Sequence, residues 1–434
     1  MSKMTSRERV RKAINHEPTD RVPIDLGSTL ISGIHVLALV KLREALGLPH
    51  KIPKAQDPMS FVSVLDDDVR QALGVDCIGL YSMNTSLGVK NTQYKNWTLP
   101  NGTDILVAKD FAVTKDESTG DFLAYPQGDM NVPPSGRMTA NAFYFDPIPR
   151  QEDLELKTDW NARDDYRDQY ALFSDEDLKN LQQQSEKLFR ETDYSLVGNF
   201  NDGGLGDIFA VPAPWLKYTK GIREPMDWYM GMHLHFDYIY DLFAMQTEIA
   251  LKKLALYHEA VGDRVDVLVL SGTDFGHQEG LLISKELYRS LFLPFYRQMN
   301  DWIHSNTTWK VFTHSCGSTF DLIPDFIESG FDILNPVQVS AKNMEAEQLK
   351  THFGKDIVFW GGGCDPQGVL PYGTPDEVYE QTKRNAEKLS AGGGFVGGNV
   401  HSIQYDVPAE NIIAEFRALR DTKPTICNFG RRKI

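Results

Sequence analysis

Short apolar runs alternate with segments of helical periodicity through the second half of the chain. Between the runs, apolar positions recur at helical spacing, as in residues 226–261 and in the helix that Ser284 caps, where Pro294 predicts a kink. Short buried strands alternating with helices predict a parallel sheet with helical crossovers. The predicted strands are residues 196–198, 266–270, 311–312, 331–334, 357–360 and 394–397.

The first half of the chain shows a less regular pattern. Thr5 and Glu8 have the spacing of a capping box, and residues 22–27 are a candidate first strand. Residues 97–99 and 105–107 alternate around Pro-Asn-Gly and predict a β-hairpin, whereas residues 152–192 are polar and mostly helical. We therefore predict an insertion over about residues 94–192, in which no chemical motif is found.

These patterns favour one fold class. No GxGxxG follows the first strand and no P-loop sequence is present, so a nucleotide-binding doubly wound sheet is disfavoured. We predict an α/β fold, a (β/α)8 TIM barrel with an N-terminal elaboration and a β-rich and helical insertion, in which residues 1–434 form a single domain. In such a barrel the active site lies at the carboxyl ends of the strands.

Composition and charge bear on the protein's binding partners and on its location in the cell. The formal net charge of −15, without a basic stripe, argues against a nucleic-acid partner. No apolar stretch approaches the ~18 residues of a membrane span, and the N-terminal segment lacks the apolar core of a secretory signal. The 4 cysteines are widely spaced, unlike a disulfide framework. We expect a cytoplasmic protein without membrane contact.

The strand over residues 311–312 is followed by His314 and Cys316. At this spacing on an extended segment both side chains can point the same way. Imidazole nitrogen and thiolate sulfur are ligands that Zn²⁺ prefers, and a catalytic zinc site needs a third protein ligand and an open fourth position. In a barrel, His401 at the end of the last strand could reach the pair. Cys364 competes for this role, although it could be a small apolar residue in a tight loop.

Other polar residues stand at predicted strand ends. Asp274 is the candidate catalytic residue. Each of these residues has a structural alternative, such as a turn or helix cap for Asp365 or a hydrogen-bonded role for a histidine. Cys316 as a nucleophile is unsupported, because no oxyanion-hole motif accompanies it. The candidate substrate-binding residues are Asn201, Asp202, His277, Asn335 and Asp365.

Three motifs carry a resemblance to a known family. They are His314-Ser315-Cys316-Gly317, Asp365-Pro366 followed by Gly373-Thr374-Pro375, and His401 ahead of Asn411. With them the chain resembles the uroporphyrinogen decarboxylase superfamily, best over residues 266–421. The resemblance implies a (β/α)8 barrel, in agreement with the strand pattern.

The superfamily has two branches. True uroporphyrinogen decarboxylases carry Arg-Gln-Ala-Gly-Arg near the N-terminus, and its arginines bind the carboxylates of the substrate. Here residues 21–28 read RVPIDLGS, without that arginine pair. Zinc-dependent corrinoid methyltransferases have His-x-Cys at His314 and Cys316, and a third ligand, usually Cys, where His401 stands.

The resemblance to the second branch implies Zn²⁺ at His314, Cys316 and His401. It also implies methyl transfer between a small molecule, either a methoxylated compound or a thiol, and a cobamide carried by a separate corrinoid protein. Histidine in place of cysteine would make the zinc less thiolate-rich and a stronger Lewis acid. Asp274 would orient or protonate the substrate.

Two rival functions stay open. One is a metal-free decarboxylase of a polycarboxylate, with Asp202 or Asp274 as proton donor. The other is a non-enzymatic scaffold that binds a corrinoid protein. The missing arginine pair favours the methyltransferase over the first, and the three-ligand set disfavours the second. The expected partners are a small-molecule substrate and a corrinoid protein, with a homodimer left open.

Overall fold

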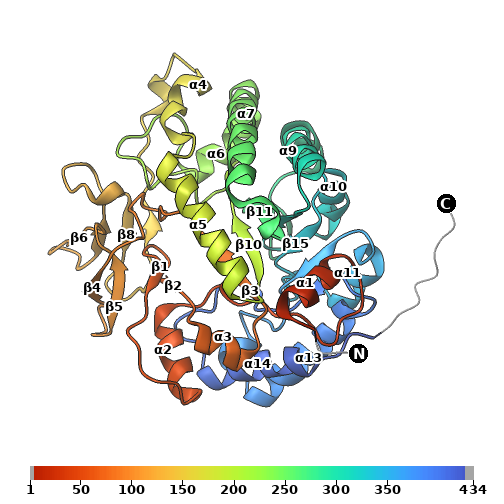
Figure 1. Ribbon diagram of the computed structural model, residues 1–434. Coiled ribbons are helices and arrows are strands. Elements are labelled where there is room, and N and C mark those ends of the chain that lie inside the picture. Colours follow the sequence, from red (N-terminus) through yellow and green to blue (C-terminus); the bar gives the residue numbers. More distant parts are fainter. Residues whose placement is uncertain (1–3, 426–434) are drawn as a thin grey trace.

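A parallel sheet forms the centre of the protein in the computed structural model, which describes residues 4–425 (Figure 1). The sheet has 7 strands in the order β17-β16-β15-β14-β11-β10-β3. Every neighbouring pair is parallel. The strands are β3 (Cys77–Leu80), β10 (Ser195–Asn199), β11 (Val267–Ser271), β14 (Lys310–His314), β15 (Ile333–Asn335), β16 (Val358–Trp360) and β17 (Phe395–Val396).

A short segment near the N-terminus connects the two edges of this sheet. Ile24 forms a parallel bridge with Gly397, which follows β17. The carbonyl of Ile24 also accepts a hydrogen bond of 2.7 Å from the N–H of Asp76, just before β3. The prediction of a TIM-barrel-like fold is confirmed. The first strand predicted over residues 22–27 is reduced to this bridge. Within that segment, Ile24 is the residue that pairs with both edges of the sheet.

Helices surround the sheet and follow the predicted crossovers. The capping box at Thr5 and Glu8 is present, as is a second one at Thr374 and Glu377. No helix within residues 4–425 combines the length and apolar composition needed to cross a membrane. The helices are α1 (Ser6–Ile14), α2 (Val36–Ala45), α3 (Asp67–Leu73), α4 (Ala162–Asp165), α5 (Asp175–Glu191), α6 (Pro225–Leu234), α7 (Phe236–Val261), α8 (Lys285–Leu287), α9 (Leu293–Asn306), α10 (Ile323–Glu328), α11 (Ala346–Phe353), α12 (Val369–Tyr372), α13 (Pro375–Ser390) and α14 (Ala409–Asp421).

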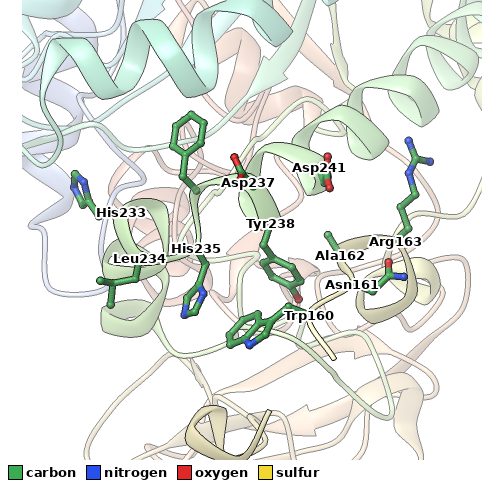
Figure 2. Close-up of a pocket in the computed structure, with 11 residues that line it drawn as sticks. Trp160, Asn161, Ala162, Arg163, His233, Leu234, His235, Asp237, Tyr238 and Asp241 are labelled. Atoms are coloured by element: carbon green, nitrogen blue, oxygen red, sulfur yellow. The ribbon is translucent and has the colours of Figure 1, made fainter. Parts of the chain in front are cut away.

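The single helix predicted over residues 226–261 is wrong, because it is divided between α6 and α7. His235 separates them with φ of −130° and ψ of 44°, which are not helical values. Its imidazole stacks on the indole of Trp160 with ring centroids 4.0 Å apart (Figure 2). This contact comes from a distant part of the sequence, so the local apolar pattern could not reveal the break.

The helix after Ser284 is irregular near the predicted kink. Ser284 caps α8 through a hydrogen bond from the N–H of Leu287. A π-helical turn, Tyr288–Phe292, then leads into α9. Pro294 has no N–H to donate, which accounts for the irregularity at this point of the helix.

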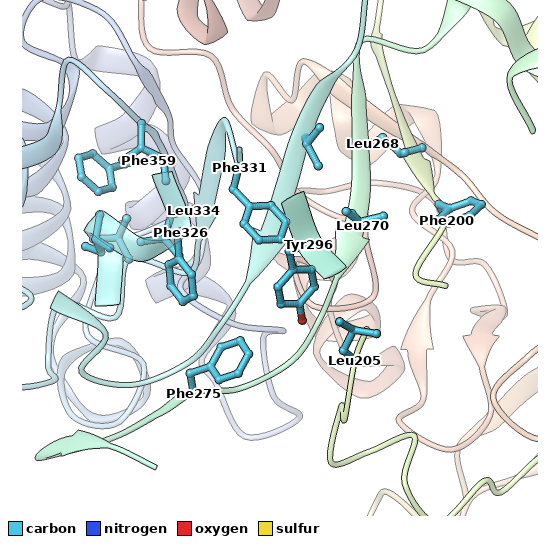
Figure 3. Packing of buried hydrophobic residues seen from close by; sticks show 14 of the residues in the cluster. Phe200, Leu205, Leu268, Leu270, Phe275, Tyr296, Phe326, Phe331, Leu334 and Phe359 are labelled. Atoms are coloured by element: carbon cyan, nitrogen blue, oxygen red, sulfur yellow. The ribbon is translucent and has the colours of Figure 1, made fainter. Parts of the chain in front are cut away.

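The two faces of the strands bury different clusters of apolar side chains. On β11, Leu268 and Leu270 face the cluster between the sheet and the surrounding helices (Figure 3). Val267 and Val269 face the opposite side, where they join a smaller cluster. Val10 of α1 belongs to the same smaller cluster, so α1 packs against the inner face of the strands. The alternation follows from the side-chain period of two along a strand.

Residues 94–147 form β-structure apart from the central sheet (Figure 1). The predicted hairpin is present, as β4 (Tyr94–Thr98) pairs antiparallel with β5 (Asp104–Ala108). A second antiparallel sheet holds β6 (Val113–Lys115), β7 (Phe122–Ala124), β8 (Gly136–Met138) and β9 (Asp146–Pro147). These strands share a separate apolar cluster with β1 (Ala55–Asp57) and with the start of α2. The remaining short strands are β2 (Val62–Ser63), β12 (Gly276–His277) and β13 (Gly280–Leu281).

Candidate metal centre

Three residues with metal-binding side chains converge at the carboxyl ends of the strands. His314 is the last residue of β14, Cys316 follows two residues later, and His401 follows β17. One ligand atom from each lies within 4.8 Å of the others. His314 Nε2 is 3.2 Å from Cys316 Sγ, and the two imidazole centroids are 5.5 Å apart. The curvature of the sheet brings β17 back toward β14, as the barrel geometry requires.

The orientation of the His314 ring is fixed by Asn335 at the end of β15. Asn335 Nδ2 donates to the carbonyl of Trp360 at 3.0 Å, so its Oδ1 faces His314 Nδ1 at 2.7 Å. An amide oxygen can only accept, which places the proton on Nδ1 and leaves the lone pair of Nε2 directed at Cys316. This is the tautomer that a metal-binding histidine requires.

Burial sets the protonation of the other two ligands. Burial lowers the pKa of His401 to about 4, with a further contribution from His314. His401 is therefore neutral at neutral pH and can donate its lone pair. Burial raises the pKa of the Cys316 thiol well above its usual value, and the carboxylates of Asp274 and Asp207 raise it further. A divalent cation between these ligands would oppose that shift, because the thiolate is the form that binds metal.

Asp274 borders the three ligands. Its Oδ1 accepts a hydrogen bond of 2.6 Å from the N–H of Cys316 and lies 3.7 Å from His314 Nε2. The carboxylate thus holds the loop that carries Cys316 and stays close to the space between the ligands. This arrangement suits a residue that orients a bound substrate.

Asp207 is a carboxylate near the site that is absent from the residues predicted from the sequence. Its Oδ1 accepts a hydrogen bond of 3.0 Å from the N–H of Phe209. Its Oδ2 abuts Gly272, where an added Cβ would lie 3.1 Å from it. Burial raises the pKa of Asp207 to about 7, and the charge of Asp274 adds to the shift. In the sequence, Asp207 follows the glycine-rich loop after β10, and this position alone does not indicate that it approaches Asp274.

The structure gives Cys364 a different environment. Its Sγ donates to Oε1 of Gln381 at 2.8 Å, and its N–H donates to Glu415 at 3.2 Å. Burial, followed by the charge of Glu415, raises the pKa of its thiol. Within residues 4–425, His401 and not Cys364 is grouped with His314 and Cys316.

Asn335, a substrate-binding candidate, has its amide engaged with His314 and Trp360. Asp202 pairs with Lys253 at 2.5 Å. Asp365 accepts a hydrogen bond from the N–H of Gln367 at 3.0 Å.

The two other candidates for binding substrate are exposed. Asn201 has a positive φ of 56°, and the Nδ1 of His277 accepts a hydrogen bond from Glu279. The group that the structure gathers is therefore His314, Cys316, His401 and Asp274. The roles predicted for the five substrate-binding candidates stay predictions.

Cys316 and His401 line a cavity of about 480 Å³. Two segments form most of its wall, residues 366–372 and residues 400–407. The described cavity volume is within the range of small-molecule sites, about 300–1,000 Å³. The complete lining is Cys316, Gln338, Pro366, Gln367, Leu370, Pro371, Tyr372, Val400, His401, Ser402, Ile403, Gln404, Asp406 and Val407.

A wider depression of about 700 Å³ lies where α6 meets α7 (Figure 2). Trp160, His235 and Tyr238 are among its lining residues, and Tyr238 makes an edge contact with Trp160 at 5.0 Å between centroids. None of the predicted site residues lines it. The cavity at Cys316 is therefore the one that accompanies the candidate metal ligands.

Comparison with known proteins supports the resemblance drawn from the motifs. Residues 241–422 match the family model described as uroporphyrinogen decarboxylase (URO-D). A stretch of 141 residues, 32% of this chain, is 30% identical to the methylated-thiol–coenzyme M methyltransferase of Methanosarcina mazei. The chain resembles the methyltransferase-like branch of the uroporphyrinogen decarboxylase superfamily. The predicted resemblance is confirmed.

The likeness to the two Methanosarcina mazei methyltransferases differs in extent between sequence and structure. The matched stretch covers 35% of the coenzyme M methyltransferase, so about a third of that relative is represented. A solved methyltransferase from Methanosarcina mazei superposes with a TM-score of 0.53 at 17% sequence identity and covers 96% of this chain and 98% of its own. At that identity the superposition shows a shared fold.

Proposed function

We propose that this protein is a zinc-dependent methyltransferase, which moves a methyl group between a small molecule and a corrinoid cofactor. The observation that carries the proposal is the convergence of His314, Cys316 and His401 beside a cavity at the barrel mouth. The similarity to methyltransferases supports the reaction class. The small molecule is a methoxylated compound or a thiol.

The donor set fits zinc. Two imidazoles and one thiolate are ligands of Zn²⁺, and the tautomer of His314 directs its lone pair toward Cys316. Three protein ligands leave a fourth position for substrate, on the side where Cys316 and His401 line the cavity. When bound, zinc would act as a Lewis acid on the heteroatom that carries or receives the methyl group.

Two carboxylates of the chain have distinct roles in this proposal. Asp274 accepts a hydrogen bond from the N–H of Cys316, and it orients the substrate beside the ligands. Asp207 is half protonated near neutral pH because burial raises its pKa to about 7. Since its charge also reaches the Cys316 thiol and raises the pKa of that group, we propose that Asp207 donates a proton to the oxygen or sulfur from which the methyl group departs.

The proposal of a corrinoid partner rests on the family resemblance. We propose a cobamide on a separate corrinoid protein as the other methyl carrier. We also propose a cytoplasmic location, since Cys77, Cys316 and Cys364 are free thiols.

The decarboxylase alternative has less support. Arg21, the one arginine in the segment that corresponds to the decarboxylase motif, forms an ion pair with Asp76 at 2.7 Å. No lysine or arginine lines the described cavity, so it offers no cation to a polycarboxylate.

The test is a methyl-transfer assay with zinc-loaded protein, a methoxylated or methylthio compound and reduced cobalamin. Formation of methylcobalamin, followed by its absorption spectrum and lost in Cys316→Ala, is the expected result. Carbon dioxide release from a polycarboxylate by zinc-free protein, with no methylcobalamin formed, would contradict the proposal.

A further inference from the structure

The cavity at Cys316 has a mostly apolar wall. Leu370, Val400, Ile403 and Val407 are buried side chains in this wall, and Pro366 and Pro371 extend it toward the opening. A ligand that covers the exposed part of this wall, chiefly Pro366, Pro371 and the ring of Tyr372, removes it from water, which stabilises the complex by about 25 cal/mol per Å² of that apolar area. The wall therefore favours an apolar ligand body.

The formal charge in the wall is negative. Apart from the candidate metal ligands, Asp406 is the one ionisable side chain other than Tyr372 among the lining residues. Lys41 lies close by, but its Nζ donates to the carbonyl of Tyr405 at 3.1 Å, and it does not line the cavity. Asp274 adds a second carboxylate behind Cys316.

Three uncharged amides, together with the hydroxyl groups of Ser402 and Tyr372, supply the neutral polar groups of the wall. Gln338 accepts from the N–H of Gly317 at 2.7 Å and donates to Gln278 at 3.1 Å, so its orientation is fixed. Gln404 donates to the carbonyl of Ser402 at 2.9 Å. The exposed side chain of Gln367 has no hydrogen-bond partner within the described part of the chain, so it can bond to a ligand.

We propose that the small molecule bound in this cavity is uncharged, with an apolar body and one hydrogen-bonding group, and that anionic methyl donors are rejected. This inference rests on the proposed function, since it names the substrate class of the same site. In the metal-free cavity, a buried anion would lose its hydration without gaining a lysine or arginine partner, and it would face Asp406 and Asp274.

A quaternary ammonium ligand fits less well than a neutral one. Sites for such cations use several aromatic faces around the ligand. Tyr372 is the one tyrosine, tryptophan or phenylalanine in the described lining, and 78% of its surface is exposed. The amides of the wall match a neutral hydrogen-bonding group instead.

The experiment compares two probes of the same shape, 4-methoxybenzamide and 4-methoxybenzoate, by calorimetric titration of the full-length protein. We expect the amide to bind at least about tenfold more tightly. Each titration is run with zinc-loaded and with chelator-treated protein, because a carboxylate can ligate zinc directly. The preference of the cavity itself is the ratio of the two affinities measured with chelator-treated protein.

Two lysine variants test whether the preference for the amide over the benzoate arises in the cavity. Gln367→Lys places a cation at the wall and should raise the affinity for the benzoate, while Gln183→Lys places the same charge on the exposed side of α5 and should not. Benzoate binding as tight as that of the amide, an equal effect of both lysines, or binding of neither probe would overturn the inference. Preference for the amide without any methyl transfer would overturn the proposed function alone.

Discussion

One side chain outside the ligand set determines how the proposed metal centre is built. Asn335 Oδ1 accepts a hydrogen bond from the Nδ1–H of His314, because its Nδ2 donates to the carbonyl of Trp360. Both contacts are buried, and Asn335 exposes 1% of its surface. The amide therefore works as a positioning group, and its effect on the metal passes through His314.

Replacing Asn335 should weaken zinc binding. Asn335→Leu removes the acceptor at Nδ1, and loss of such a partner typically lowers metal affinity about 10–100-fold. Asn335→Asp keeps an acceptor there and should retain most of the affinity. Competition with a chromophoric chelator measures both constants.

Asn385→Leu is the control for this prediction, because Asn385 Nδ2 donates to the carbonyl of Gly363 and does not contact His314. Wild-type zinc affinity in Asn335→Leu, with folding intact by circular dichroism, would show that His314 needs no such positioning.

Asp207 should control the pH dependence of methyl transfer. Its pKa is raised to about 7, so its protonated, proton-donating form decreases as pH rises through 7. The wild-type rate should therefore fall above pH 7. Asp207→Asn should lack this falling limb and should lower the rate at pH 6 by about 10²-fold.

Initial rates between about pH 5.5 and 8.5 measure this effect. Asp241→Asn, an exposed carboxylate on α7, is the matched control and should keep the wild-type profile. An unchanged falling limb in Asp207→Asn would assign the limb to another group.

Sequence and structure agree on residues whose chemistry is local. The spacing of His314 and Cys316 after a short apolar run is enough to predict that both side chains lie on one side of the chain. Asp207 was not predicted because its approach to Gly272 depends on the path of the long loop after β10. The spacing of residues within one strand does not indicate the path of such a loop.

Strands were easier to predict than the breaks between helices. The buried strands β11, β14 and β16 appear as apolar runs with turn residues after them, so their positions follow from composition. The division between α6 and α7 depends on His235 stacking against Trp160. That contact joins two segments separated in sequence, and no periodicity within either one encodes it.

The packing of α14 against the loop before α12 contains a buried carboxyl group. Glu415 on α14 is fully buried, and its Oε1 accepts the N–H of Cys364 at 3.2 Å. Its Oε2 has no hydrogen-bond partner within residues 4–425. Burial raises the pKa of Glu415 to about 8, so the folded protein keeps it protonated at neutral pH.

This carboxyl group should make the protein less stable as pH rises. The folded state binds the proton more tightly than the unfolded state, whose pKa is the usual 4.5, so the free energy of unfolding decreases between about pH 4.5 and 8. Glu415→Gln removes the titration, and its stability relative to wild type should increase over that range by a few kcal/mol.

Urea unfolding at about pH 5 and pH 8 measures the difference. Glu410→Gln, on the exposed first turn of the same helix, should leave the pH dependence of unfolding as in wild type. A constant difference between Glu415→Gln and wild type at both values would show that Glu415 is ionised in the folded state.

At the scale of the whole molecule, closure of the sheet creates the candidate site. His314 and His401 lie at the ends of β14 and β17, with β15 and β16 between them in the sheet order. They meet because the strands curve into a barrel whose edges are joined at Ile24 and Gly397. The strand pattern was sufficient to predict this meeting, since carboxyl ends of parallel strands share one mouth.

One zinc ion should bind at His314, Cys316 and His401. The most direct measurement is the metal content, by mass spectrometry, of protein purified without a chelating tag, for wild type, Cys316→Ala and Cys364→Ala. We expect about one zinc per chain in wild type and in Cys364→Ala, because Cys364 faces Gln381, and none in Cys316→Ala. Zinc retained in Cys316→Ala, or no zinc taken up by the wild type, would show that these three residues do not form a zinc site.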